Sequence, residues 1–203
     1  MGSGCCAFGD LRERERERER EEGRRYLSGR ETSRTVQNIE VKTRLAERAK
    51  VEKKLSALGA RPMWVRTQKD TFFVVSEGWL KLRESEGKPA ELISYRRSSE
   101  HSGPRPSDYD VLLVGDGAAA LRLLSRVLPI DRVVEKERTL WIYEHTRVHL
   151  DRVAKLGEFL ELETVVEPGK LEEARAENAR IVETLGLEET EFVAQSYRDL
   201  LGR

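Results

Sequence analysis

Charged and apolar residues alternate along several short stretches of the chain, and this alternation predicts β-strands. In residues 38–44, the polar residues Asn38, Glu40, Lys42 and Arg44 alternate with apolar or β-branched residues. Because successive side chains of a strand point to opposite faces, the two sets are expected on opposite sides. Later stretches space charged residues in a similar way, or carry single candidates, at Lys81/Arg83, Arg97, Lys136/Arg138, Arg147/His149/Asp151 and Glu161/Glu163.

The pattern along the rest of the chain predicts eight strands and four helices. Strands are predicted at 37–45, 62–75, 79–84, 90–97, 109–114, 132–143, 147–153 and 158–166, where β-forming residues lie between turn signals. Helices are predicted at 46–58, 117–128, 170–185 and 191–201. The segment 98–107 contains one glycine and two prolines and is predicted to be a loop.

These elements predict an α+β fold built on a closed eight-stranded antiparallel β-barrel. Short connections favour antiparallel pairing, and closure removes the exposed edges of a sheet. Eight strands enclose room for side chains or for one small ligand. If the charged faces point inward, the barrel is a polar tunnel and the helices pack outside, against its apolar wall.

Residues 1–35 are predicted to be a disordered low-complexity tail in front of a folded domain at 36–203. The stretch 12–21 alternates strictly between arginine and glutamate, so it has no apolar face whose burial could offset the entropy of ordering. Gly2, Cys5 and Cys6 suggest an N-terminal lipid anchor, but Cys6 stands where the myristoylation pattern requires serine or threonine. We therefore favour an unmodified tail.

The amino-acid composition argues against several classes of protein. The 203 residues include 37 basic and 37 acidic side chains, and this zero net charge argues against a general nucleic-acid binder. No apolar run reaches the roughly 18 residues of a transmembrane helix. The only cysteines are Cys5 and Cys6, so the folded part has none, which indicates a reducing compartment and predicts a cytoplasmic protein.

Six motifs occur in an order that is similar to one known family. They are NIEVK at 38–42, DTFF at 70–73, LKLRE at 80–84, AELI at 90–93, TRVHLD at 146–151 and LGEFLELE at 156–163. Together they resemble the CYTH superfamily, or triphosphate tunnel metalloenzymes, whose hallmark is Glu-x-Glu-x-Lys on the first strand. The superfamily includes class IV adenylate cyclases, thiamine triphosphatases and inorganic tripolyphosphatases.

The resemblance implies roles for the alternating charges. Carboxylates suit hard divalent metals, and Lys and Arg suit phosphate. The implied ligands of Mg²⁺ or Mn²⁺ are Glu40, Asp151, Glu161 and Glu163. The implied phosphate-binding residues are Lys42, Lys81, Arg83, Arg97, Lys136, Arg138 and Arg147, and the implied catalytic residues are Glu40, Lys42 and His149. The alternative is that these charges form salt bridges on a solvent-facing sheet and that His149 is a hydrogen-bonded structural residue.

Two positions depart from the family pattern. Asn38 replaces the first hallmark glutamate, and its amide can donate an oxygen to Mg²⁺ but lacks the negative charge. Trp79 stands where similar proteins often carry arginine. It either stacks on a base or thiazole ring of the substrate or caps the barrel, and we favour the cap.

The resemblance therefore implies a metal-dependent enzyme acting on tripolyphosphate, thiamine triphosphate or a nucleoside triphosphate. We favour a phosphohydrolase over a class IV cyclase, because no nucleoside-binding motif is evident. A non-catalytic module that binds polyphosphate or another phosphorylated ligand is the alternative, and Asn38 is its main support. RNA 5′-end processing is a third candidate, disfavoured by the zero net charge. The sequence leaves both a monomer and a homodimer open.

Overall fold

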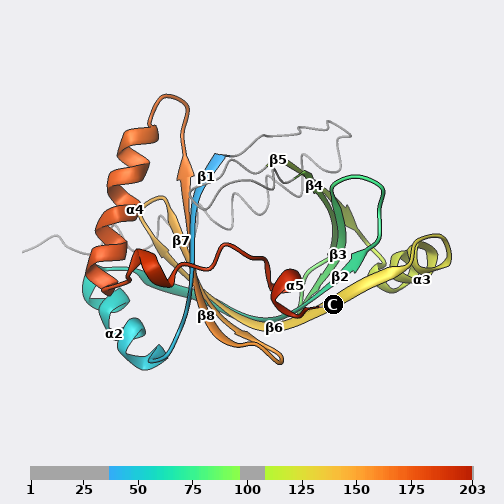
Figure 1. Cartoon of the computed structure of the whole chain (residues 1–203), viewed down its shortest axis with the longest axis horizontal. Coiled ribbons are helices and arrows are strands. Elements are labelled where there is room, and N and C mark those ends of the chain that lie inside the picture. Colours follow the sequence, from blue (N-terminus) through green and yellow to red (C-terminus); the bar gives the residue numbers. More distant parts are fainter. Residues whose placement is uncertain (1–36, 97–107, 203) are drawn as a thin grey trace, which may run out of the picture. The chain divides into compact units, whose positions relative to one another are not determined.

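A single antiparallel sheet with helices on both of its faces forms the described part of this computed structural model, residues 37–96 and 108–202 (Figure 1). The strands are β1 (Gln37–Arg44), β2 (Arg61–Phe73), β3 (Trp79–Ser85), β4 (Ala90–Arg96), β5 (Asp108–Val114), β6 (Ile130–Tyr143), β7 (Thr146–Val153) and β8 (Gly157–Val166). The helices are α2 (Arg48–Leu58), α3 (Gly117–Val127), α4 (Leu171–Leu185), the 3₁₀ turn η1 (Glu189–Glu191) and α5 (Tyr197–Leu200). The predicted tail 1–35 and Arg97 lie outside the described residues.

The strand order is β1-β8-β7-β6-β2-β3-β4-β5, and each neighbouring pair is antiparallel. The eight predicted strands and the α+β class are therefore confirmed. The predicted closure is not: within the described ranges no hydrogen bonds join β1 to β5, so these two remain edge strands. Figure 1 shows the sheet bending through a wide arc between its two edges. The strand pattern predicts how many strands pair, but closure also requires the two edges to meet, which the pattern does not encode.

The register of the strands brings the alternating charges onto one concave face. Lys42 of β1 lies opposite Glu161 of β8, and Glu161 lies opposite His149 of β7. Arg138 of β6 lies opposite Asp151 of β7. Because residues directly opposite each other in an antiparallel pair share a face, side chains from four strands converge there.

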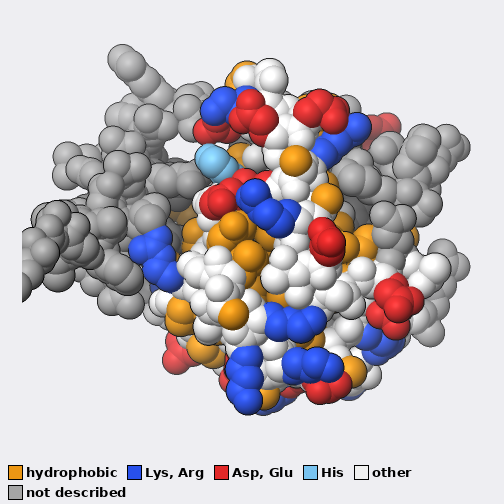
Figure 2. All heavy atoms as spheres, turned by 90° about the vertical axis from the view of Figure 1, so that its left-hand side faces the viewer, with side chains coloured by type: hydrophobic (Ala, Val, Ile, Leu, Met, Phe, Trp, Pro, Cys, Tyr) orange, Lys and Arg blue, Asp and Glu red, His pale blue; other side chains and the backbone are white. Residues whose placement is uncertain are grey.

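Two apolar regions of the opposite, convex face are covered by helices, as predicted, whereas a polar strip with Thr67, Lys69 and Glu135 lies on the same face without that cover. Leu55 of α2, Ile181 of α4 and Leu162 of β8 are fully buried in one core between the helices and the sheet. Burying each such side chain contributes about 1.5–3 kcal/mol to the stability of the fold. A second core joins Leu82 of β3 to α3 through Leu121 and its neighbours. Figure 2 shows the side of α2 and α4, where basic and acidic side chains intermingle around apolar ones.

Local signals in the sequence explain where these helices end. Gly59 follows α2 with a positive φ of 91°, and its N–H donates to the carbonyl oxygens of Leu55 and Ser56. This left-handed geometry suits glycine, which has no Cβ to clash. Asp116 caps the start of α3 by accepting a hydrogen bond from the N–H of Ala119. None of the helices in 37–96 and 108–202 combines the length and apolar character needed to cross a membrane.

The predicted helix 191–201 is wrong in its first half, because that segment pairs with β1 instead. Phe192 forms a β-bridge with Thr43, and the N–H of Val193 donates to the carbonyl oxygen of Lys42 at 2.7 Å. These contacts satisfy backbone groups that a helix would otherwise satisfy within itself. The chain is therefore extended before α5.

A capping box starts α5. The hydroxyl of Ser196 accepts a hydrogen bond from the backbone N–H of Asp199, and the carboxylate of Asp199 accepts one from the N–H of Ser196. Figure 1 shows α5 on the concave side of the sheet, whereas α2 and α4 lie on the other side. The segment leading to α5 therefore carries Tyr197 onto the charged face.

Candidate functional site

The first group of charged side chains on the concave face is centred on Asp70. This buried carboxylate accepts hydrogen bonds from Nε and Nη2 of Arg83 at 2.7 and 2.8 Å and from Nζ of Lys81 at 3.0 Å. Burial alone would raise the pKa of Asp70, but Arg83 and Lys81 lower it well below its usual value. Burial, assisted by Arg83, lowers the pKa of Lys81 to about 8. Asp70 thus holds Lys81 and Arg83, which lie two positions apart on β3 and share one face of the sheet.

The second group is centred on Asp151, which is fully buried. Arg138 donates to its two oxygens from Nε and Nη2 at 2.7 and 2.6 Å, and the hydroxyl of Tyr197 donates at 2.9 Å. Nζ of Lys136 lies 3.8 Å from the same carboxylate. Burial would raise the pKa of Asp151, but Arg138 and Lys136 lower it. Burial, with Arg138 acting in the same direction, lowers the pKa of Lys136 to about 7.

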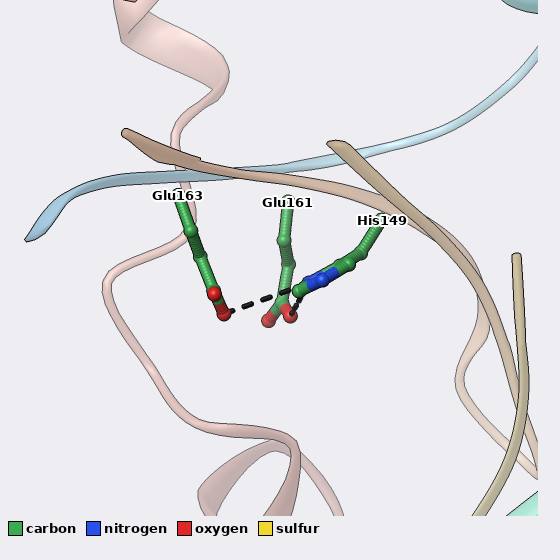
Figure 3. A group of neighbouring side chains, drawn as sticks. All are labelled: His149, Glu161 and Glu163. Carbon is green, nitrogen blue, oxygen red and sulfur yellow. Dashed lines mark ion pairs between the residues drawn. The ribbon is translucent and has the colours of Figure 1, made fainter. Parts of the chain in front are cut away.

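The third group consists of His149 on β7 and Glu161 and Glu163 on β8, whose side chains converge in Figure 3. Nδ1 of His149 lies 3.5 Å from Glu163 and 3.9 Å from Glu161. One nitrogen or oxygen atom from each residue lies within 4.8 Å of the others. Burial, followed by the charge of Arg138, lowers the pKa of His149, so a neutral imidazole is favoured.

Basic side chains keep the two glutamates of this third group ionised. Glu161 is 3.1 Å from Nζ of Lys42 and 2.6 Å from Nη2 of Arg138, and Glu163 is 3.2 Å from Nε of Arg147. Burial would raise the pKa of Glu161, but Lys42 and its other neighbours lower it well below its usual value. Ionised carboxylates and a neutral imidazole are the forms that bind divalent metals.

Of the twelve residues predicted for the site, eleven can be placed, and all lie on the same face of the sheet. Glu40 is the most peripheral: it is exposed and lies opposite Glu163 in the register of β1 and β8. Asp151 lies with Arg138 and Tyr197 rather than with the three residues of the possible metal group. The other nine are Lys42, Lys81, Arg83, Lys136, Arg147, His149, Glu161, Glu163 and the Arg138 that bridges two groups.

The sequence analysis missed two functional candidates, Asp70 and Tyr197. Asp70 belongs to a period-two row with Gln68 and Phe72, which places it opposite Arg83, so the strand pattern contained a signal for it. Tyr197 belongs to a short helix that reaches the site only through tertiary contacts, among them a ring 4.6 Å from Nζ of Lys42. No local periodicity marks such a residue.

Trp79 lies in an aromatic cluster at one end of the concave face. Its ring stacks on Tyr95 with centroids 6.0 Å apart and an interplanar angle of 4°, and it meets Phe72 edge-on. The guanidinium carbon of Arg198 in α5 lies 3.8 Å from the ring centroid. Residues of this cluster pack with Tyr197 and the end of α5, so Trp79 helps to cover this end of the face.

The CYTH domain family matches residues 37–197, and the chain therefore belongs to this family. No protein with a curated description matches the sequence significantly. Among solved structures, the PH1012 protein from Pyrococcus horikoshii OT3 is similar, with 25% identity and a TM-score of 0.71 over 80% of this chain and 98% of that one.

Two further solved structures share the fold at lower identity. A candidate adenylate cyclase from Vibrio parahaemolyticus has 16% identity and a TM-score of 0.70, over 84% of this chain and 100% of its own. HpAC1 from Hippeastrum has 15% identity and a TM-score of 0.60, over 80% and 94%, and its structure is described as revealing a dominant triphosphatase activity.

Proposed function

We propose that this protein is a metal-dependent enzyme that acts on a triphosphate and hydrolyses it. The observation that carries the proposal is a row of basic side chains directly beside a group of possible metal ligands. A metal-bound polyphosphate needs both, because cations bind its oxygens and the metal bridges them. The basic residues are Lys42, Lys81, Arg83, Lys136, Arg138 and Arg147, and the possible ligands are His149, Glu161 and Glu163.

The two buried aspartates orient two arginines so that these can bind phosphate. Asp70 and Asp151 each hold a guanidinium group through two hydrogen bonds, which fixes the orientation of Arg83 and Arg138. A fixed guanidinium loses little rotamer entropy when its remaining N–H groups bind phosphate oxygens. Lys81 and Lys136 add compact charges beside them.

The residues of the third group fit the divalent metal that the family implies. Their donors are two carboxylates and a buried imidazole whose Nδ1 has no hydrogen-bond partner in the described part of the chain. When bound by these residues, Mg²⁺ or Mn²⁺ would supply positive charge to offset the charge at phosphorus and would activate a water molecule. Lys42 lies beside Glu161 to neutralise the terminal phosphate, and Glu40, exposed on the same face, is proposed to accept a proton from water.

The aromatic cluster favours hydrolysis over cyclisation. A cyclase must hold a nucleoside so that the ribose hydroxyl attacks the α-phosphate. Trp79, the aromatic residue considered for base stacking, is already engaged by Tyr95, Phe72 and Arg198. A hydrolase needs only the phosphates and a water, which asks less of this end of the face.

A binding module without catalysis is the second candidate, and Asn38 favours it. Asn38 is buried, and its Oδ1 has no hydrogen-bond partner among the described residues. An amide at the first hallmark position removes one negative charge from the carboxylate row. Such a protein binds triphosphate through its basic residues without requiring a metal and without turnover.

The test is the release of phosphate and pyrophosphate from tripolyphosphate, thiamine triphosphate and ATP, each with Mg²⁺ or Mn²⁺. The variant carries Glu161→Gln and Glu163→Gln, which keep the shape of the side chains and remove their charge. The matched control is Glu158→Gln, which changes a carboxylate of the same strand that pairs with Arg152 instead.

Phosphate release that requires metal, survives Glu158→Gln and disappears in the double variant supports the proposed hydrolase. Pyrophosphate release from ATP without free phosphate contradicts the proposed hydrolase and indicates a cyclase. Binding of tripolyphosphate without any turnover contradicts the enzyme and supports the binding module.

A further inference from the structure

We propose that His149 is a direct metal ligand, and that with Glu161 and Glu163 it forms a mixed nitrogen–oxygen site that favours Mn²⁺ over Mg²⁺. The inference concerns the site of the proposed function and rests on it. Both the family resemblance and the charge pattern point to carboxylates alone as the ligands. The structure adds a nitrogen donor to them and assigns a different role to Asp151.

The spacing of the three side chains suits a shared ion better than direct hydrogen bonds. Nδ1 of His149 is 3.5 Å from Glu163 and 3.9 Å from Glu161, beyond the usual length of a hydrogen bond to nitrogen. Ligand atoms about 2.1 Å from one metal ion lie about 3.0–3.4 Å from each other. Movements of a few tenths of an ångström therefore bring Nδ1 of His149 to this spacing from each of the two carboxylates, and Figure 3 shows the three side chains converging from two adjacent strands.

The imidazole lacks the partner that a structural histidine would have. His149 is only 5% exposed, and among residues 37–96 and 108–202 its buried Nδ1 has no hydrogen-bond partner, only the carboxylate of Glu163 at 3.5 Å. Buried polar atoms in proteins are nearly always hydrogen-bonded, so this nitrogen calls for an explanation. A metal ion between Nδ1 and the two carboxylates supplies the missing partner.

Asp151 is a poorer ligand than Glu161, although Arg138 and Lys42 also contact Glu161, because Asp151 has more donors around it and no exposed surface. Arg138 contacts both carboxylate oxygens of Asp151, and Tyr197 and Lys136 approach one of the two. The Asp151 side chain is fully buried, whereas the side chains of Glu161 and Glu163 are 16% and 23% exposed. An ion arriving from solvent therefore reaches the glutamates, and Asp151 acts as a positioning residue for Arg138.

The nitrogen donor determines which metals the site prefers. Mg²⁺ binds oxygen ligands in near-ideal octahedral geometry and gives up its waters reluctantly. Imidazole is a better ligand for first-row transition metals than for Mg²⁺, and Mn²⁺ also accepts carboxylates. A site with one imidazole and two carboxylates therefore favours Mn²⁺ when both ions are offered.

The first experiment uses a protein in which His149 is the sole histidine. The chain has three histidines, so His101→Gln and His145→Gln leave only His149. His145 pairs with Glu177 outside the site, and His101 lies outside the described residues. Pulsed EPR of Mn²⁺ bound to this variant is expected to show coupling to an imidazole ¹⁴N nucleus. This measurement requires neither turnover nor a change at His149.

The second experiment compares metal affinities by titration calorimetry, without triphosphate. His149→Gln is expected to weaken Mn²⁺ binding about tenfold or more, and Mg²⁺ binding less than about threefold. The control His145→Gln is expected to leave both affinities unchanged.

The outcomes separate this inference from the proposed function. Mn²⁺ bound without imidazole coupling, together with an unchanged Mn²⁺ affinity in His149→Gln, overturns the role of His149 and leaves a carboxylate metal site intact. Failure of the unaltered protein to bind Mn²⁺ or Mg²⁺ overturns the role of His149 together with the metal-dependent function. Imidazole coupling in the sole-histidine variant without any triphosphate turnover supports the ligand and contradicts the enzyme.

Discussion

The hydroxyl of Tyr197 donates a 2.9 Å hydrogen bond to the buried carboxylate of Asp151, and this contact ties α5 to the centre of the charged face. Burial, together with the charges of Glu161 and Asp151, raises the pKa of Tyr197 far above its usual value. The phenol therefore keeps its proton at neutral pH, and it remains a donor. Arg138 satisfies the same carboxylate from the sheet, so Asp151 links two elements that are remote in sequence.

Replacement of Tyr197 by Phe tests this link. The ring can keep its edge-to-face contact with Phe159, whereas the buried carboxylate loses one donor. A hydrogen bond to a charged group contributes about 1.5–3 kcal/mol, and we expect the free energy of unfolding to fall by that amount in urea denaturation. The control Tyr143→Phe changes a less buried tyrosine on β6 and should cost less than about 0.5 kcal/mol. Equal losses in both variants would argue against the link.

Replacement of Asp70 by Asn should destabilise the protein and make its stability depend on added polyanion. Lys81 and Arg83, which are half-buried, then lack their counter-charge, and we expect a loss of about 1–3 kcal/mol. Tripolyphosphate supplies negative charge to the same cations, so it should raise the Tm of Asp70→Asn more than that of the unaltered protein.

Thermal unfolding with and without metal-free tripolyphosphate measures this difference. The control is Asp116→Asn, because asparagine caps a helix about as well as aspartate and Asp116 is exposed at the start of α3. If tripolyphosphate raises the Tm of all three proteins equally, Lys81 and Arg83 do not bind the anion.

Triphosphate affinity should fall as the pH rises from about 6 to 9. The pKa of Lys136 is lowered to about 7 and that of Lys81 to about 8, so the free protein loses both charges within this range. Loss of one charge-assisted contact corresponds to about 1.5–3 kcal/mol, or about tenfold or more in affinity. Calorimetry with tripolyphosphate in EDTA measures the slope. In Lys136→Arg, which stays charged, the affinity should fall less steeply with pH. If the slope is unchanged, Lys136 does not contribute to triphosphate binding.

The same lysine should affect folding in the opposite direction. Because its folded pKa lies below the usual value of 10.5, the unfolded chain binds more protons between about pH 7 and 10.5. The contribution of Lys136 to the free energy of unfolding therefore rises with pH in that window. Lys136→Met should flatten this rise in urea titrations at pH 7, 8 and 9, and an unaltered profile would contradict the assigned pKa.

Glu177 should matter for stability and not for the site. It is a buried residue of α4 that accepts hydrogen bonds from the hydroxyl of Thr146 at 2.6 Å and from the N–H of His145 at 3.0 Å. Glu177→Gln turns one acceptor into a donor facing donors, and we expect a loss of about 1–3 kcal/mol in urea denaturation. Mn²⁺ and tripolyphosphate affinities should not change, because these contacts hold α4. Glu173→Gln, exposed on the same helix, is the control.

Much of the fold could be predicted because the alternation of residues within a strand indicates which side chains share a face. The alternation of Glu40 and Lys42 with apolar residues predicted which side chains share a face, and the register of β1 and β8 confirms it. The first half of the helix predicted at 191–201 is wrong because Phe192 and Val193 pair with β1, a partner about 150 positions away, whereas α5 lies in its second half. No pattern within the segment itself reports that competition.

The candidate site was predictable in part for the same reason. Lys81 and Arg83 follow the strand period, and so does Asp70, which could have been found by continuing the row along its own strand. Tyr197 could not, because its place on the concave face depends on where the extended segment before α5 runs. The structure was also needed to assign different roles to Asp151, which positions Arg138, and to Glu161, a possible metal ligand. In the sequence both are acidic residues at positions that face inward.

All three possible metal ligands lie on the hairpin of β7 and β8, and this affects the order in which parts of the site form during folding. His149, Glu161 and Glu163 come from two strands joined by residues 154–156 alone, and hairpins form within about 1–10 μs. The cations Lys81 and Arg83 on β3 and Lys42 on β1 join this group only when strands distant in sequence pair, which is slower. During refolding of the full chain, this hairpin can therefore bring the possible metal ligands together before Lys42, Lys81 and Arg83 join them, so metal in the refolding buffer is positioned to influence the rate of folding as well as the final stability.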